Sequence, residues 1–179
     1  MLLYINCCPR VESRTERLAQ AVLAGREREE LCLYEQPLVP LDRARLAQRD
    51  ALIAAQAWDD PMFRWAKQFA AADEIVIAAP YWDLSFPAVL KTYVENIYVT
   101  GIVTVYGEDG CPVGLCRAKR LTYVTTSGGA YDPQFSYEYL AKMAKTYFGI
   151  AETRLVYAEK LDIAGNNAEE ILQQAIDKL

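Results

Sequence analysis

The chain has 179 residues, of which 53% are hydrophobic and 24% are charged, a composition typical of one soluble globular domain spanning residues 1–179. A net charge of −5 without any basic run argues against a nucleic-acid or anionic-membrane surface. No segment has the length and apolarity of a membrane span, and no leader-like segment is recognised, so we expect a cytoplasmic protein.

The absence of histidine limits the chemistry that this chain can perform unaided. It removes the usual zinc ligands, the Ser-His and Cys-His nucleophile pairs and the commonest general base. An enzyme with this sequence therefore needs a bound cofactor as its source of reactivity.

The five cysteines do not form a recognisable framework. Adjacent Cys7 and Cys8 are poorly suited to disulfides, and we predict small buried filler rather than a redox pair of low pKa. Cys111 and Cys116 alone are a weak signal for a metal site, and we predict none.

The predicted elements alternate between strand and helix along the chain. Short apolar runs predict buried strands, and amphipathic spacing, N-caps and prolines predict the helices. In chain order the prediction is strand 2–8, a helix opening at Ser13 with Glu16 completing a capping box, strand 29–36, helix 42–57, helix 61–72, strand 74–80, helix 87–97, an aromatic ribbon at 101–115 turning at 108–110, strand 120–126, helix 134–148, strand 154–161 and helix 168–179.

This alternation predicts an α/β fold of the flavodoxin-like type, a three-layer sandwich around a five-stranded parallel sheet in the order 2-1-3-4-5. The 101–115 ribbon is an insertion into it. A ligand is expected at the carboxyl ends of the strands, where the loops 8–15, 80–86 and 126–131 should converge.

The three loops together suit a flat ring that carries one phosphate. The first places Ser13 and Thr15 at a helix N-terminus, where a phosphate monoester binds well, provided that Glu12 and Glu16 point outward. The second presents the aromatic faces of Tyr81 and Trp82, and the third a Gly-Gly turn that lets backbone approach a ligand. FMN fits this description better than a free nucleotide does, although each loop alone is also explained by capping, turn formation or packing.

With these loops in place, the chain resembles the flavodoxin-like NAD(P)H-dependent FMN oxidoreductases, specifically the azoreductase and quinone reductase family. The likeness covers nearly the whole chain. It is most specific in EIVIAAPYWDLSFPAVLKTYVENI (74–97), TGIVTVYGEDGCPVGL (100–115) and KRLTYVTTSGGAY (119–131).

The resemblance implies that FMN accepts hydride from NADH or NADPH and passes it to a quinone, an azo compound or another flat acceptor. The cofactor-binding residues that it implies are Pro9, Ser13, Arg14 and Thr15 around the phosphate, Pro80, Tyr81, Trp82, Asp83 and Leu84 along the isoalloxazine, and Thr126, Ser127, Gly128 and Gly129 over its other edge.

Asp83 and Tyr131 are the candidate catalytic residues. Asp83 stands where many family members carry Asn, and a carboxylate there would disfavour an anionic reduced ring and alter the redox potential. Tyr131 is a candidate proton donor or stacking lid. Cys7, Cys8 and Pro9 also depart from the family, which commonly has small hydroxyl residues in the first loop.

Family members are typically homodimers with the active site at the subunit boundary. On that analogy Tyr106 and Tyr147 would reach the partner's flavin and line the substrate pocket across the dimer. Two alternatives remain open at this stage: a flavodoxin-type FMN electron carrier, and a flavin reductase that releases reduced FMN. A receiver-type signalling module lacks its acidic residues here.

Overall fold

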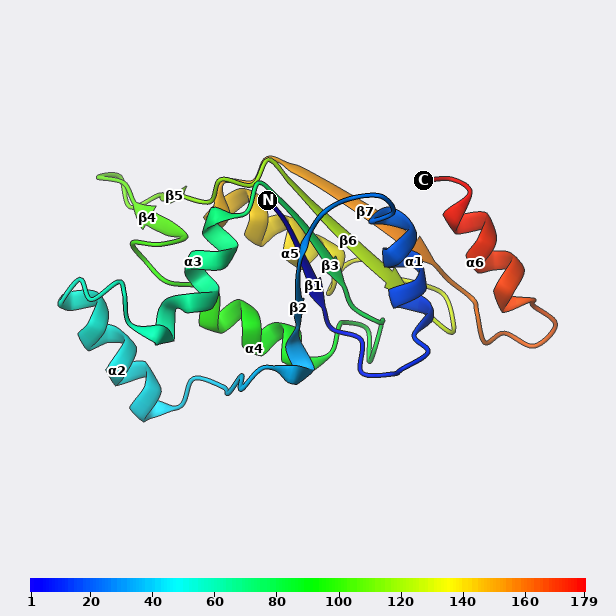
Figure 1. Ribbon diagram of the computed structural model, residues 1–179, viewed down its shortest axis with the longest axis horizontal. Coiled ribbons are helices and arrows are strands. Elements are labelled where there is room, and N and C mark those ends of the chain that lie inside the picture. The colour runs from blue at the N-terminus through cyan, green and yellow to red at the C-terminus, as the bar shows by residue number, and fades with distance from the viewer.

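A five-stranded parallel sheet forms the centre of the protein, which is described over residues 1–179 by a computed structural model (Figure 1). Its strands lie in the order β2-β1-β3-β6-β7 with every neighbouring pair parallel, which confirms the predicted order. They are β1 (Leu2–Asn6), β2 (Glu29–Cys32), β3 (Glu74–Ala78), β6 (Arg120–Thr126) and β7 (Glu152–Ala158).

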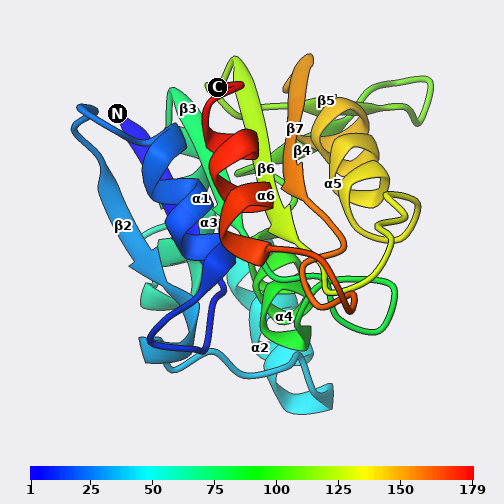
Figure 2. The same cartoon turned by 90° about the vertical axis from the view of Figure 1, so that its right-hand side faces the viewer.

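Helices cover both faces of the sheet and complete the predicted three layers. They are α1 (Arg14–Val22), α2 (Arg43–Ala54), α3 (Arg64–Ala71), α4 (Ala88–Ile97), α5 (Tyr137–Met143) and α6 (Ala168–Ile176), with short turns η1 (Leu33–Glu35), η2 (Pro61–Phe63) and the π-helical η3 (Ala144–Phe148). Figure 2 shows α1 and α6 side by side on one face, whereas α3, α4 and α5 lie on the other. None of these helices is long and apolar enough to cross a bilayer.

Side-chain alternation along the strands divides the core into two unequal halves. Leu3 and Ile5 of β1 belong to a cluster of 26 buried residues against α3, α4 and α5. Leu2 and Tyr4, at the intervening positions, belong to a cluster of 13 against α1 and α6. Both faces of a central strand are therefore apolar, which explains the continuous hydrophobic runs in the sequence.

Most strands end earlier than predicted, because local turns redirect the chain at the ligand edge. β1 stops at Asn6, whose Oδ1 accepts the backbone N–H of Cys8 at 2.9 Å. β2 stops at Cys32, where η1 replaces the rest of predicted strand 29–36, and β3 stops at Ala78. β7 covers Glu152–Ala158 rather than 154–161, since Lys160 adopts a left-handed conformation with φ 63°.

The helix predictions are right in number and wrong at several ends. α2 ends at Ala54 instead of 57 because Gln56 is left-handed, and helix 61–72 begins as the turn η2 before continuing as α3. Helix 134–148 begins at Tyr137 and finishes as the π-helical η3, and α6 ends at Ile176.

The predicted ribbon at 101–115 is present as β4 (Thr104–Tyr106) paired antiparallel with β5 (Pro112–Gly114). It turns at Gly107–Gly110, where Gly110 N–H donates to the Gly107 carbonyl. At its far end Gly114 packs against the chain that leaves η3. A Cβ at Gly114 would lie 2.0 Å from the backbone nitrogen of Gly149, so only glycine allows this close approach.

We expect Gly114→Ala to destabilise the protein by about 2 to 3 kcal/mol, because the new methyl group would overlap backbone atoms that cannot swing aside. Equilibrium urea unfolding measures this change. Gly129→Ala is the matched control, since a Cβ there meets nothing within 4 Å and Gly129 has no positive φ. Equal stability of the two variants would contradict the close packing of the ribbon on η3.

Candidate functional site

A cavity of about 440 Å³ opens at the carboxyl ends of β1, β3 and β6, where the sequence predicted that three loops converge. Of the predicted cofactor-binding residues, those on its wall are Pro9, Ser13, Arg14, Thr15, Pro80, Tyr81, Trp82, Thr126, Ser127 and Gly128. Asp83, Leu84 and Gly129 are not on the wall. Arg10, Glu12, Leu161 and Asp162 line the cavity and were not among the predicted site residues.

The N-terminus of α1 forms the polar end of the cavity. Ser13 is the N-cap as predicted, and its Oγ accepts the Glu16 backbone N–H at 3.2 Å. The N–H groups of Arg14 and Thr15 come before the first intrahelical hydrogen bond and are left without helical acceptors. Together with the positive end of the helix dipole they form an anion site.

The two acidic residues beside this helix, Glu12 and Glu16, lie only partly as the sequence led us to expect. The capping box is not closed, because the Glu16 carboxylate accepts the side-chain amide of Asn6 at 3.0 Å instead of returning to Ser13. Glu16 does not line the cavity, as expected, but Glu12 does. The condition that both acidic residues stay off the cavity wall is therefore met by Glu16 and not by Glu12.

A buried hydrogen bond joins α1 to the end of the neighbouring strand. The hydroxyls of Thr15 and Thr126 lie 2.6 Å apart, with both residues buried. Next to them, Ser127 Oγ donates to the Gly129 carbonyl at 2.8 Å and thereby shapes the Gly-Gly turn. These contacts fix the distance between the first and third loops.

The loop after β3 is a tight hairpin that projects beyond the cavity. Trp82 and Ser85 exchange two backbone hydrogen bonds, of 2.9 and 2.7 Å, around Asp83 (φ 51°) and Leu84 (φ 67°). Two left-handed residues in a row make a type I′ turn, which favours Asp or Asn at its first position and strains a leucine at its second. The left-handed conformation of the turn therefore explains the choice of Asp at position 83. Leu84 is 60% exposed at the tip of the turn.

Tyr81 stands between this hairpin and the third loop. Its ring meets that of Tyr131 edge-on, with centroids 4.9 Å apart, and its hydroxyl is buried without a hydrogen-bond partner. The Tyr131 hydroxyl lies 2.9 Å from Ser136 Oγ, and Tyr131 is not on the cavity wall. Burial raises the pKa of Tyr131, so its hydroxyl keeps its proton across the physiological range.

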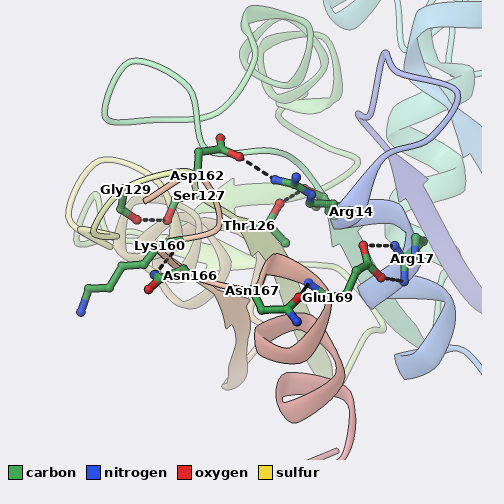
Figure 3. A network of polar contacts seen from close by, with 11 residues as sticks. Arg14, Arg17, Thr126, Ser127, Gly129, Lys160, Asp162, Asn166, Asn167 and Glu169 are labelled. Carbon is green, nitrogen blue, oxygen red and sulfur yellow. Dashed lines mark hydrogen bonds and ion pairs between the residues drawn. The ribbon is translucent and has the colours of Figure 1, made fainter. Parts of the chain in front are cut away.

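A fourth loop, between β7 and α6, closes the site and was missed by the sequence analysis. Backbone N–H groups of Lys160, Leu161 and Asp162 donate to the carbonyls of Gly129, Ser127 and Gly128, at 2.8, 3.2 and 2.9 Å. Figure 3 shows the Asp162 side chain reaching to Arg14. This loop was missed because the last strand was predicted to extend to residue 161. The signals available in the sequence were Gly165 and Asn167, a turn glycine and the N-cap of α6.

The cysteines beside the site are packing residues, as predicted. Cys7 and Cys8 are buried, and burial raises the pKa of both thiols, that of Cys8 to about 11. Thiolate reactivity at neutral pH is therefore suppressed. Cys111 is exposed on the ribbon and Cys116 is half-buried, and the structure has no group of three or more His, Cys, Asp or Glu residues that could hold a metal ion.

Tyr106 and Tyr147 lie near each other but apart from the cavity. Both contact Tyr98: its hydroxyl is 2.9 Å from that of Tyr106, and its ring stacks edge-on against Tyr147 at 5.3 Å. Tyr98 and Tyr147 line a shallow groove of about 420 Å³ between α4 and α5, and none of its residues lines the cavity. Within one chain, neither tyrosine contributes to the cavity wall.

A family model described as a flavodoxin-like fold matches residues 1–179. The chain belongs to this flavodoxin-like family. A curated relative that matches over nearly full length is an FMN-dependent NADH:quinone oxidoreductase from Coprothermobacter proteolyticus, 34% identical over 190 aligned positions that cover 98% of this chain and 94% of the relative.

Two further comparisons give the same picture. FMN-dependent NADH:quinone oxidoreductase 2 of Clostridium acetobutylicum is 44% identical over 125 residues, 67% of this chain and 62% of the relative, so the match spans less than two thirds of that relative's length. The crystal structure of azoreductase from Bacillus anthracis superposes with a TM-score of 0.85 at 25% identity, covering 99% of this chain and 95% of the other. The expected resemblance to FMN-dependent quinone reductases and azoreductases is confirmed.

Proposed function

We propose that this protein is an FMN-dependent NAD(P)H oxidoreductase that reduces quinones, azo compounds or similar flat acceptors. The observation that carries the proposal is the joining of an anion site at the α1 N-terminus and an aromatic wall at Tyr81 and Trp82 in one cavity. The names of the relatives support the same cofactor and reaction.

The donor set of the cavity fits FMN, although Glu12 and Asp162 are two carboxylates on the wall that oppose its phosphate. Free N–H groups of Arg14 and Thr15 and the hydroxyl of Ser13 suit a phosphate monoester. Tyr81 presents a buried hydroxyl without a partner, which is costly unless a ligand atom satisfies it.

Bound FMN would supply the hydride chemistry that a chain without histidine lacks. The residues of this chain bind the phosphate, hold the aromatic wall in place and exclude water from one side of the site. Trp82, which is 39% exposed, and Leu84 leave an apolar opening against which a flat acceptor or a nicotinamide can lie.

Asp83 belongs to this proposal as a residue at the rim. It follows Trp82 directly in the chain and occupies the first left-handed position of the type I′ turn, and it does not line the cavity. The proposed effect on the redox potential of the flavin acts through space from the turn.

The decisive experiment adds NADH or NADPH to FMN-loaded protein without oxygen and follows the visible flavin bands. We expect the bands to bleach within the mixing time or seconds after it, and to return when a quinone is added. Bands that persist with both nucleotides would support the electron-carrier alternative. Bleaching accompanied by loss of flavin on gel filtration would support the flavin reductase alternative.

Tyr131 is proposed as a positioning residue for Tyr81 rather than as the proton donor, because its hydroxyl is bonded to Ser136. We expect Tyr131→Phe to retain turnover within about twofold and to lose about 1 kcal/mol of stability, the usual net value of one hydrogen bond. Steady-state kinetics across pH 6–9 and thermal unfolding measure both. A tenfold loss of kcat with a changed pH profile would instead establish proton donation.

A homodimer is also part of the proposal, with Tyr106 and Tyr147 approaching the flavin of the partner subunit. The exposed ring of Tyr106 and the groove at Tyr98 and Tyr147 support a contact surface on this side. Sedimentation equilibrium should give twice the chain mass of 20.2 kDa. A mass of one chain at micromolar concentration would contradict the dimer and the proposed role of both tyrosines.

A cytoplasmic location completes the proposal, and the five free cysteines are consistent with it.

A further inference from the structure

An ion pair crosses the phosphate end of the cavity. Arg14 Nη1 donates to Asp162 Oδ1 at 2.7 Å, and both residues line the cavity wall (Figure 3). The two side chains are 40% and 69% exposed, so a ligand entering from solvent can reach both. Arg14 is the cation nearest in sequence to the free N–H groups of α1, which makes its partner relevant to any anion bound there.

The backbone of Asp162 is held by the fold as well as by the ion pair of its side chain. Its backbone N–H is bonded to the Gly128 carbonyl at 2.9 Å, and the two preceding residues are bonded to the same turn. The side chain lies directly over Gly128, where a Cβ would come within 2.4 Å of the Asp162 carboxylate. The Asp162 side chain can therefore occupy this position only because residue 128 is a glycine.

The charges on the cavity wall cancel one another. The basic residues are Arg10 and Arg14, and the acidic residues are Glu12 and Asp162. A phosphate monoester carries about −1.5 to −2 charges at pH 7, and an anion of that charge is attracted by arginines and repelled by carboxylates. An anion at α1 that also pairs with Arg14 has to separate it from Asp162 and then remains close to the carboxylate left behind.

We propose that Asp162 competes with the phosphate of FMN for Arg14 and so lowers the contribution of the phosphate to flavin affinity. This inference rests on the proposed function and adds a determinant of affinity to it. The competition acts through Arg14, which Asp162 contacts directly, whereas Tyr81 and Trp82 supply the aromatic wall of the cavity. The phosphate then contributes little to flavin affinity in this protein, and most of the affinity comes from the ring.

The test compares FMN with riboflavin, which has the same ring and no phosphate. Apoprotein is titrated with each flavin, and binding is followed by quenching of flavin fluorescence. We expect Asp162→Asn to lower the Kd for FMN five- to tenfold and to leave the Kd for riboflavin within twofold. The variant keeps the backbone hydrogen bond of residue 162 and exchanges an exposed group for one of equal size, so it should fold.

Glu169→Gln is the matched control. It removes the same charge from a similar pair, the bidentate contact of Glu169 with Arg17 one turn further along α1, and Glu169 does not line the cavity. We expect its FMN affinity to change less than twofold. An equal gain in Glu169→Gln and Asp162→Asn would reduce the effect to overall charge and overturn the inference.

A double-mutant cycle with Arg14→Gln provides a second measurement that does not depend on one variant. If Asp162 acts by competing for Arg14, the gain in FMN affinity caused by Asp162→Asn should be at least threefold smaller in the Arg14→Gln background than in the wild-type background. An FMN affinity that falls in Asp162→Asn would show that the carboxylate orients Arg14 for the phosphate, and would overturn the proposal.

The outcome also separates this inference from the proposed function. Wild-type protein that binds neither flavin would overturn the FMN cavity and the competition together. Wild-type protein that binds both flavins, with FMN and riboflavin affinities unaffected by Asp162→Asn, would leave the flavin site intact and overturn the competition alone.

Discussion

Parallel pairing of all five strands is the constraint on which the site depends. Since every strand runs in the same direction, the loops that follow β1, β3, β6 and β7 all emerge at one edge of the sheet. Hydrogen bonds between these loops then set their spacing: Thr15 to Thr126, Tyr81 N–H to the Thr126 carbonyl at 3.1 Å, and the β7–α6 loop to the Gly-Gly turn. The cavity is what remains between segments held in this way.

The two ends of the cavity differ in how their chemistry arises. At the α1 end, binding capacity comes from backbone N–H groups that any helix leaves free, so modest side chains such as Ser13 and Thr15 suffice. At the other end it comes from aromatic faces whose positions depend on packing: Tyr131 supports Tyr81, and a strained type I′ turn carries Asp83 and Leu84. The α1 end therefore follows from the topology of the fold, whereas the aromatic end depends on the side chains that pack beside Tyr81.

Sequence patterns therefore predicted the sheet order, the inserted ribbon, the N-cap at Ser13 and the three loops that surround the cavity, and the resemblance to the family supplied most of the residues on its wall. Hydrophobic runs and caps are local signals, and the βαβ rule converts them into topology. The closed turn at 83–84, the presence of Glu12 on the cavity wall and the loop at 160–162 depend on contacts between distant segments and on left-handed backbone at non-glycine residues. Such conformations leave little trace in residue type, so Asp162 could not be placed without the structure.

The central claim is that FMN occupies this cavity with its phosphate at the N-terminus of α1. A crystal structure of the FMN complex tests it most directly. The account predicts phosphate oxygens within hydrogen-bond distance of the Arg14 and Thr15 N–H groups, the ring against Tyr81 and Trp82, and Arg14 turned from Asp162 toward the phosphate. Flavin bound elsewhere, or with its phosphate directed away from α1, would contradict the account.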